Sequence, residues 1–185
     1  MTKFGMPLFL EDKSGSLTGS EYTDLYNRAR LVLRCTLRTP ARAAYMVYDL
    51  AERADPRSGL PVPAACLDFG PADALGSVKI RDGEHVPMGQ YLTKLSPLGS
   101  SKNRKFVASD GQEYRWAHQA GQDDEWVCRN ASNYHIASYT LKAAGEPKYT
   151  GSSGCALTIE EDYAHLAPEL LASLTIMRHI AKYNL

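Results

Sequence analysis

The sequence predicts a mainly β protein, in which an antiparallel meander of strands is followed by a single buried helix. Turn signals recur about every ten residues through the second half of the chain, a spacing typical of sandwiches and barrels. Near the C-terminus the apolar residues change to a period of three and four, which is typical of a helix. At 185 residues the chain is long enough to bury a sizeable core as one domain.

The first part of the chain predicts a strand, a polar loop and two further strands. Residues 1–29 are expected to contribute an N-terminal strand and loop to the same domain as residues 30–185. The loop is expected at 11–20 (EDKSGSLTGS), which is polar and rich in Ser and Gly. Apolar residues alternate over 31–37, and 44–50 has the aromatic and β-branched content of a second strand. A short break between these two strands suggests that they are antiparallel neighbours.

Residues 53–76 contain four prolines and three glycines, so no long element is expected there. This Pro/Gly-rich excursion is predicted to contain one short strand at 65–69. The meander then follows, with an Asp-Gly hairpin turn at 109–112 whose glycine can adopt a positive φ. Its predicted strands are 77–80, 104–108, 113–118, 126–129, 134–141, 148–149 and 155–159.

A helix is predicted at about 166–182, because large apolar residues recur there at three- and four-residue intervals. Pro168 suits the first turn, and Glu169 suits the positive end of the helix dipole. Alanines and an isoleucine fill most of the remaining circumference, so the helix must be buried on nearly every side. It could lie across a cupped sheet or run through the middle of a barrel.

The composition narrows the classes of function. Lys plus Arg equals Asp plus Glu at 21 each, so the net charge is zero and nucleic-acid binding is not expected. No signal peptide or transmembrane stretch is recognisable, which makes a cytoplasmic location the expectation. The four cysteines are widely separated and are interpreted as small buried apolar residues. The five histidines lack metal-ligand spacing, so neither a metal nor a cofactor is expected.

Residues 101–116 begin with a basic run, continue through Phe and Asp-Gly, and end in Tyr-x-Trp. This stretch is similar to the core signature of a large fungal domain family of unknown function. Ala-x-Tyr at 137–139, Leu-x-Ile at 157–159 and the apolar helix match later parts of that signature, so the resemblance covers about 77–183. It implies the architecture of the tubby C-terminal, LURP-one and phospholipid-scramblase group. The combined prediction is a closed antiparallel β-barrel around the C-terminal helix, which would leave no interior space for a substrate.

The first candidate site is a basic hairpin formed by Lys102, Arg104, Lys105 and Arg115. Paired strands can place several of these charges on one face, where they could bind a phosphate headgroup. The group that the sequence resembles includes phosphoinositide binders, which favours the same ligand class. The alternative interpretation is a solvated sheet edge that is protected by charge against aggregation.

The second candidate site is a pocket near the barrel rim, lined by His118, Cys128, His135 and Tyr139. Nucleophilic catalysis would need Cys128 with His118 and a neighbouring Asp, which is the one local set that permits it. A cluster of large aromatic residues could form a stacking platform, but their spacing favours the barrel wall. Its members are Tyr114, Trp116, Trp126, Tyr134 and Tyr139.

The sequence therefore favours a non-enzymatic cytosolic binding or scaffold domain. Its expected partner is an anionic lipid headgroup, a membrane surface or another protein, recognised through the basic hairpin. The alternative is an enzyme or small-molecule binder that uses the second candidate pocket. Self-association through an exposed sheet edge is a third hypothesis.

Overall fold

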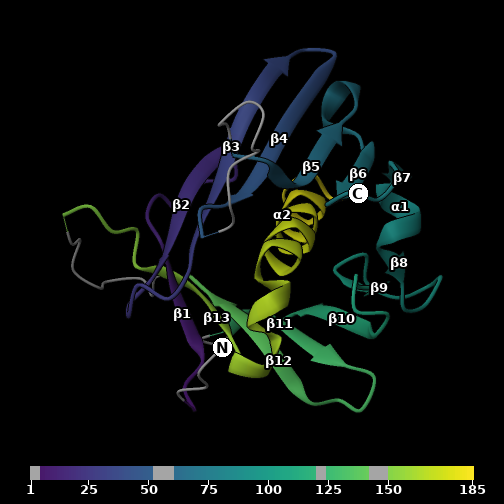
Figure 1. Ribbon diagram of the computed structural model, residues 1–185. Helices are drawn as coiled ribbons and strands as arrows, with labels where there is room; N and C mark the ends of the chain where they lie inside the picture. The colour runs from purple at the N-terminus through teal and green to yellow at the C-terminus, as the bar shows by residue number, and fades with distance from the viewer. Residues whose placement is uncertain (1–4, 52–60, 120–123, 142–149) are drawn as a thin grey trace.

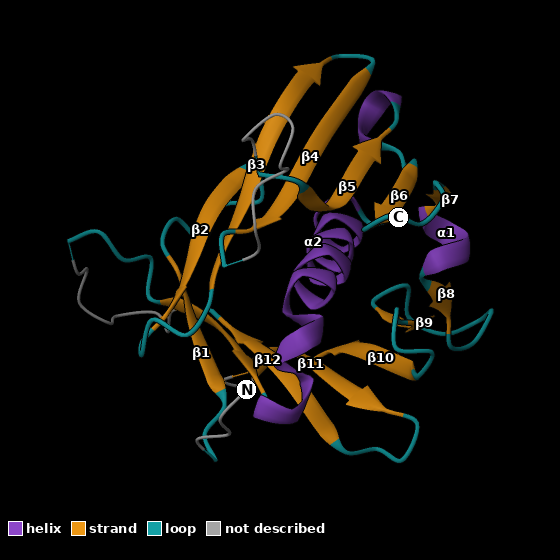
Figure 2. Cartoon of the chain, viewed as in Figure 1, coloured by secondary structure: helices purple, strands orange, loops and turns teal. Residues whose placement is uncertain are grey.

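The computed structural model describes residues 5–51, 61–119, 124–141 and 150–185, and these residues form one antiparallel sheet with a helix packed against it (Figures 1 and 2). The sheet has 13 strands in the order β7-β6-β5-β4-β3-β2-β1-β13-β12-β11-β10-β9-β8. β1 pairs with β13, so the N-terminal and C-terminal strands lie side by side in the middle of the sheet. The strands are β1 (Leu8–Asp12), β2 (Gly19–Asp24), β3 (Arg30–Thr39), β4 (Arg42–Asp49), β5 (Pro63–Phe69), β6 (Ser77–Ile80), β7 (Val86–Pro87), β8 (Thr93–Lys94), β9 (Asn103–Val107), β10 (Glu113–His118), β11 (Asp124–Asn130), β12 (His135–Thr140) and β13 (Cys155–Ile159).

The sheet curls around the helix but does not close, so the prediction of a closed barrel is wrong. Its two edges, β7 and β8, are not paired with each other. Between them the chain folds into the one-turn helix α1 (Met88–Tyr91), whose Met88 is fully buried (Figure 1). Each edge strand is two residues long, and Pro87 has no N–H to donate. These edges are therefore too short to complete a ladder.

The C-terminal helix α2 (Ala167–Tyr183) confirms the helix predicted at about 166–182. It follows a 3₁₀ segment, η2 (Glu161–Leu166), and lies inside the curl of the sheet, with contacts to β4 and β5 (Figure 2). Most of its side chains are buried, as its all-round apolar surface requires. It ends at Asn184, which adopts a left-handed conformation and donates its N–H to the Ile180 carbonyl. Neither α2 nor any other helix in the described residues is long and apolar enough to cross a membrane.

Several meander strands and the 65–69 strand agree with prediction, and β9 and β10 pair around Asp110 and Gly111 as expected. The predicted loop at 11–20 is wrong at both ends, because β1 extends to Asp12 and β2 begins at Gly19. The inward positions of β2 include Ser20 and Asp24, and these buried polar residues conceal the strand pattern. A third short helix, η1 (Pro71–Asp73), lies within the excursion at 53–76. The predicted strand at 148–149 lies outside the described residues.

Candidate functional site

The four residues of the predicted basic hairpin do not share one face of the sheet. Lys105 and Arg115 are directly opposite each other on β9 and β10, and both bind Glu113, at 2.7 Å and 2.9 Å. Arg129 on β11 is opposite Arg115 and extends the row. Arg104 points the other way, opposite the buried Trp116. The outward face therefore carries a row of three cations that is partly neutralised by Glu113.

Arg104 is only 5% exposed and binds backbone instead of solvent. Its Nε donates to the Ser101 carbonyl at 2.9 Å, and its Nη1 donates to the Leu92 carbonyl at 3.1 Å. Burial lowers the pKa of this guanidinium. Leu92 directly precedes β8, and Ser101 lies near the end of the loop that joins β8 to β9, so Arg104 ties the start of the edge strand to the end of that loop.

The loop between β8 and β9 presents two leucines to solvent. Leu98 is 100% exposed and Leu95 is 44% exposed. The loop is nevertheless ordered by its own hydrogen bonds, since Gly99 N–H donates to the Ser96 carbonyl and Asn103 N–H to the Ser100 carbonyl. Pro97 occupies the second position of the first turn, where its fixed φ is favourable. Leu98 is therefore displayed at the tip of a structured loop.

Two lysines flank these leucines, Lys94 on the edge strand β8 and Lys102 at the end of the loop. Neither ammonium group makes a salt bridge with any carboxylate in the described residues. Sequence reasoning identified Lys102 but overlooked Leu95 and Leu98. The sequence did contain a signal for them, because two leucines lie in a Ser/Pro/Gly-rich loop where neither a helical nor a strand pattern explains apolar residues. We call Lys94, Leu95, Leu98 and Lys102 the edge loop.

The second candidate pocket is not assembled around accessible reactive groups. Cys128 is fully buried opposite Trp116, and burial raises the pKa of its thiol far above the ordinary range. His118 packs edge-on against Trp126 and lies 3.2 Å from Glu125. Tyr139 is also fully buried.

His135, at the start of β12, contacts a carboxylate outside this set of four residues. It pairs with Arg129 in the sheet, and its Nδ1 lies 3.7 Å from a Glu160 carboxylate oxygen. The Tyr139 hydroxyl donates to Asp12 at 2.8 Å, so it is held within the core. Two of the four residues are therefore buried in the core, and each of the two histidines lies beside a glutamate.

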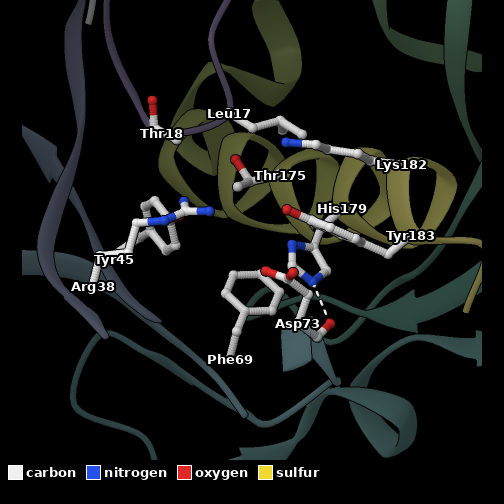
Figure 3. A pocket seen from close by; sticks show the side chains of 10 residues that line it. All are labelled: Leu17, Thr18, Arg38, Tyr45, Phe69, Asp73, Thr175, His179, Lys182 and Tyr183. Atoms are coloured by element: carbon white, nitrogen blue, oxygen red, sulfur yellow. Dashed lines mark hydrogen bonds between the residues drawn. The ribbon is translucent and has the colours of Figure 1, made fainter. Parts of the chain in front are cut away.

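A separate recess lies beside the C-terminal end of α2, where this helix faces β3, β5 and η1 (Figure 3). The His179 ring stacks on Phe69 with 3.9 Å between ring centroids, and its Nε2 lies 2.8 Å from the Asp73 carbonyl oxygen. The recess is partly open and offers about 10 Å³, which is room for about one water molecule. The lining residues are Leu17, Thr18, Arg38, Tyr45, Phe69, Asp73, Thr175, His179, Lys182 and Tyr183.

Burial lowers the pKa of His179 below its ordinary value, and the charges of Lys182 and Arg38 act in the same direction. The unfolded chain therefore binds a proton at this imidazole more readily than the folded protein does. We expect the free energy of unfolding to fall as the pH drops below the ordinary histidine pKa of about 6.5. Urea denaturation of the wild type and of His179→Phe across this pH range measures the effect, and the variant should lose less stability on acidification. Equal pH dependence of the two proteins would contradict this assignment.

The model of a family of unknown function, DUF6593, matches residues 34–183. The matched segment begins within β3 and ends at the last residue of α2, so it contains the edge loop and most of the residues that line the recess. No curated protein and no solved structure matches the chain. The comparisons thus supply a family without an assigned activity.

Proposed function

The chain belongs to the family of unknown function DUF6593, and we propose that it is a non-enzymatic module that binds anionic membrane surfaces through the edge loop. The observation that carries the proposal is the complete exposure of Leu98 at the tip of an ordered loop, flanked by two lysines that make no salt bridge within the described residues. Apolar tips with basic flanks are a common way for soluble domains to attach to the membrane interface.

The leucines would supply the apolar part of the binding energy. Burying a leucine side chain that is otherwise exposed is favourable by roughly 1.5–3 kcal/mol. Leu98 has its whole side chain available for this transfer, and Leu95 has about half. Since the turns of the loop already hold Leu98 outward, little conformational entropy would be lost on insertion.

The cations would supply the electrostatic part. A Lys or Arg close to an anionic leaflet contributes about 1 kcal/mol. Lys94 and Lys102 flank the inserting leucines, and Lys105 and Arg115 lie on the outward face of the next two strands. Glu113 neutralises part of the latter pair, so the two loop lysines should have the larger effect.

The wider resemblance to the tubby, LURP-one and scramblase group, which includes phosphoinositide binders, favours the same ligand class. That resemblance lies beyond the family match and enters here as part of the proposal. Arg104 has a different role from the one expected for it, because its guanidinium binds the Leu92 carbonyl before β8 and the Ser101 carbonyl near the end of the loop. We therefore treat it as a positioning residue, and it is unsuitable for a test of headgroup contact.

Co-sedimentation with phosphatidylcholine vesicles, with and without phosphatidylserine, tests this function. We expect the wild type to bind the phosphatidylserine vesicles, and binding to weaken at high salt. Leu98→Ser should reduce the partition coefficient by roughly tenfold or more, since one leucine is no longer transferred from water. Lys94→Ala combined with Lys102→Ala should reduce it by a similar factor.

Two control variants match these changes elsewhere on the surface. Leu25→Ser removes a leucine that is 66% exposed in the turn between β2 and β3. Arg34→Ala combined with Lys79→Ala removes two cations from β3 and β6. Both controls should bind like the wild type. If the wild type binds neither kind of vesicle, the proposed function is wrong. If the test and control variants lose binding equally, the edge loop is not the contact with the membrane.

A further inference from the structure

Two cations meet in the recess beside α2 without a carboxylate between them. Arg38 comes from β3 and Lys182 from the last turn of α2, and both line the recess (Figure 3). Neither makes a salt bridge with any carboxylate in the part of the chain that the structure describes, and Asp73 is the one acidic residue that lines the recess. Like charges that converge in this way repel each other unless an anion lies between them.

The Asp73 charge acts on Arg38 from the opposite wall, and the groups that contact the two cations directly are tyrosines. The Arg38 Nη1 donates to the Tyr45 hydroxyl at 3.0 Å, and the Lys182 ammonium lies 5.1 Å from the centroid of the Tyr183 ring. In Figure 3 the two charged groups point from opposite sides toward Thr175, whose hydroxyl donates to the Leu171 carbonyl. Both cations therefore retain N–H groups that can donate to a ligand.

The favourable interaction of a cation with the C-terminal end of a helix dipole explains why a lysine occupies position 182 in the last turn of α2. The helix dipole does not explain why Arg38 lies here as well, because Arg38 belongs to strand β3. The segment η1, on the other side of the recess, has a strained backbone, because Ala72 and Asp73 both have a positive φ, at 51° and 58°. This conformation brings the Asp73 carbonyl oxygen to His179 and fixes the histidine on Phe69.

The recess itself is too small for a whole ligand, but it is not isolated. A depression of about 360 Å³ adjoins it and shares both Arg38 and Asp73 with it. The turn between β3 and β4 forms one side of this depression, and residues around η1 form the other. Arg42 also lines it, although its guanidinium is engaged by both carboxylate oxygens of Asp68 at 2.6 Å. A ligand can therefore present one group to Arg38 while the rest lies in the depression.

We propose that this recess is a second binding site, which takes the oxyanion of a small phosphorylated or carboxylated molecule between Arg38 and Lys182. The guanidinium fork suits a planar or tetrahedral oxyanion, and the ammonium group supplies a second charge. The site lies on β3, η1 and α2, whereas the edge loop joins β8 to β9. The two proposals are therefore independent.

Thermal unfolding in the presence of inorganic phosphate or acetate, with NaCl used to hold the ionic strength constant, tests this site. A ligand that binds only the folded state stabilises it by RT ln(1 + [L]/Kd), so tighter binding raises the unfolding midpoint further. We expect one or both anions to raise the wild-type midpoint, and the larger shift identifies the preferred oxyanion. Arg38→Ala combined with Lys182→Ala should weaken the apparent affinity at least about tenfold.

The charge-matched control is Arg34→Ala combined with Lys79→Ala, which should respond to the anion like the wild type. An NMR titration of the wild type gives a readout that does not depend on folding of the variants. Saturable shifts of the His179 ring and the Arg38 guanidinium would support the site. A wild-type midpoint that does not respond, or equal responses in both double variants, would overturn it.

Discussion

Replacement of Asp12 by asparagine should lower the free energy of unfolding by about 3 kcal/mol, because it removes the charge from a buried carboxylate. Asp12 is fully buried. One carboxylate oxygen accepts from Ser20 and the Gly15 N–H, and the other accepts from the Tyr139 hydroxyl. Arg178 on α2 lies 3.7 Å away and would be left without its carboxylate. An asparagine side chain cannot accept from all of these donors.

Urea denaturation followed by tryptophan fluorescence measures this change, since both tryptophans are buried. Glu21→Gln is the control, because Glu21 pairs with Arg30 on the surface and both side chains are about half exposed. That pair should contribute no more than about 0.5 kcal/mol. A double-mutant cycle with Arg178→Met then isolates the coupling between Asp12 and Arg178. Equal effects of Asp12→Asn and Glu21→Gln would contradict the assigned role of Asp12.

Replacement of Glu169 by alanine should also cost about 3 kcal/mol, and its effect should concentrate at the open edge of the sheet. The buried carboxylate of Glu169 accepts from the Tyr91 hydroxyl at 2.9 Å, and from both the hydroxyl and the N–H of Ser109 at 2.7 Å and 3.0 Å. Tyr91 belongs to α1, and Ser109 belongs to the turn between β9 and β10. Glu169 therefore links α2 both to α1, which precedes the edge strand β8, and to the turn between β9 and β10.

Hydrogen exchange distinguishes this local effect from general destabilisation. In Glu169→Ala, the amides of Leu92 and Ala108, which donate to Met88 and Gln112, should lose protection before those of β3 and β4. Glu169→Gln retains the size and one acceptor of the side chain and should have a smaller effect. Uniform loss of protection across the sheet in the alanine variant would contradict a specific role at the edge.

The elements that depend on local pattern were accessible from the sequence. The apolar residues of α2 repeat at helical spacing over 17 residues, so its bounds could be predicted closely. The hairpin of β9 and β10 follows from Asp110-Gly111, and Gly111 indeed has a positive φ of 80°. β2 was missed because two of its three buried side chains, Ser20 and Asp24, are polar and find their partners elsewhere in the chain. The buried Asp24, for example, accepts from the Phe9 N–H.

The candidate sites show a similar division. Strand alternation already places Arg104 with Phe106 and opposite to Lys105, so the split of the basic hairpin could have been predicted from residue numbers. Its hydrogen bonds to Leu92 and Ser101 could not, because they depend on where the loop returns to the sheet. Likewise, the sequence contains no signal that Arg38 and Lys182 meet, since they lie on different elements far apart in the chain.

The sequence by itself determined that this protein is mainly β, with one helix that must be buried on nearly every side. Periodicity and turn chemistry act over a few residues, and they are sufficient for that conclusion. Only the tertiary structure decided whether the sheet closes around the helix, because closure depends on two edges that each offer just two residues for pairing. It also decided which cations remain unpaired and which leucines reach solvent, since both depend on contacts between distant segments.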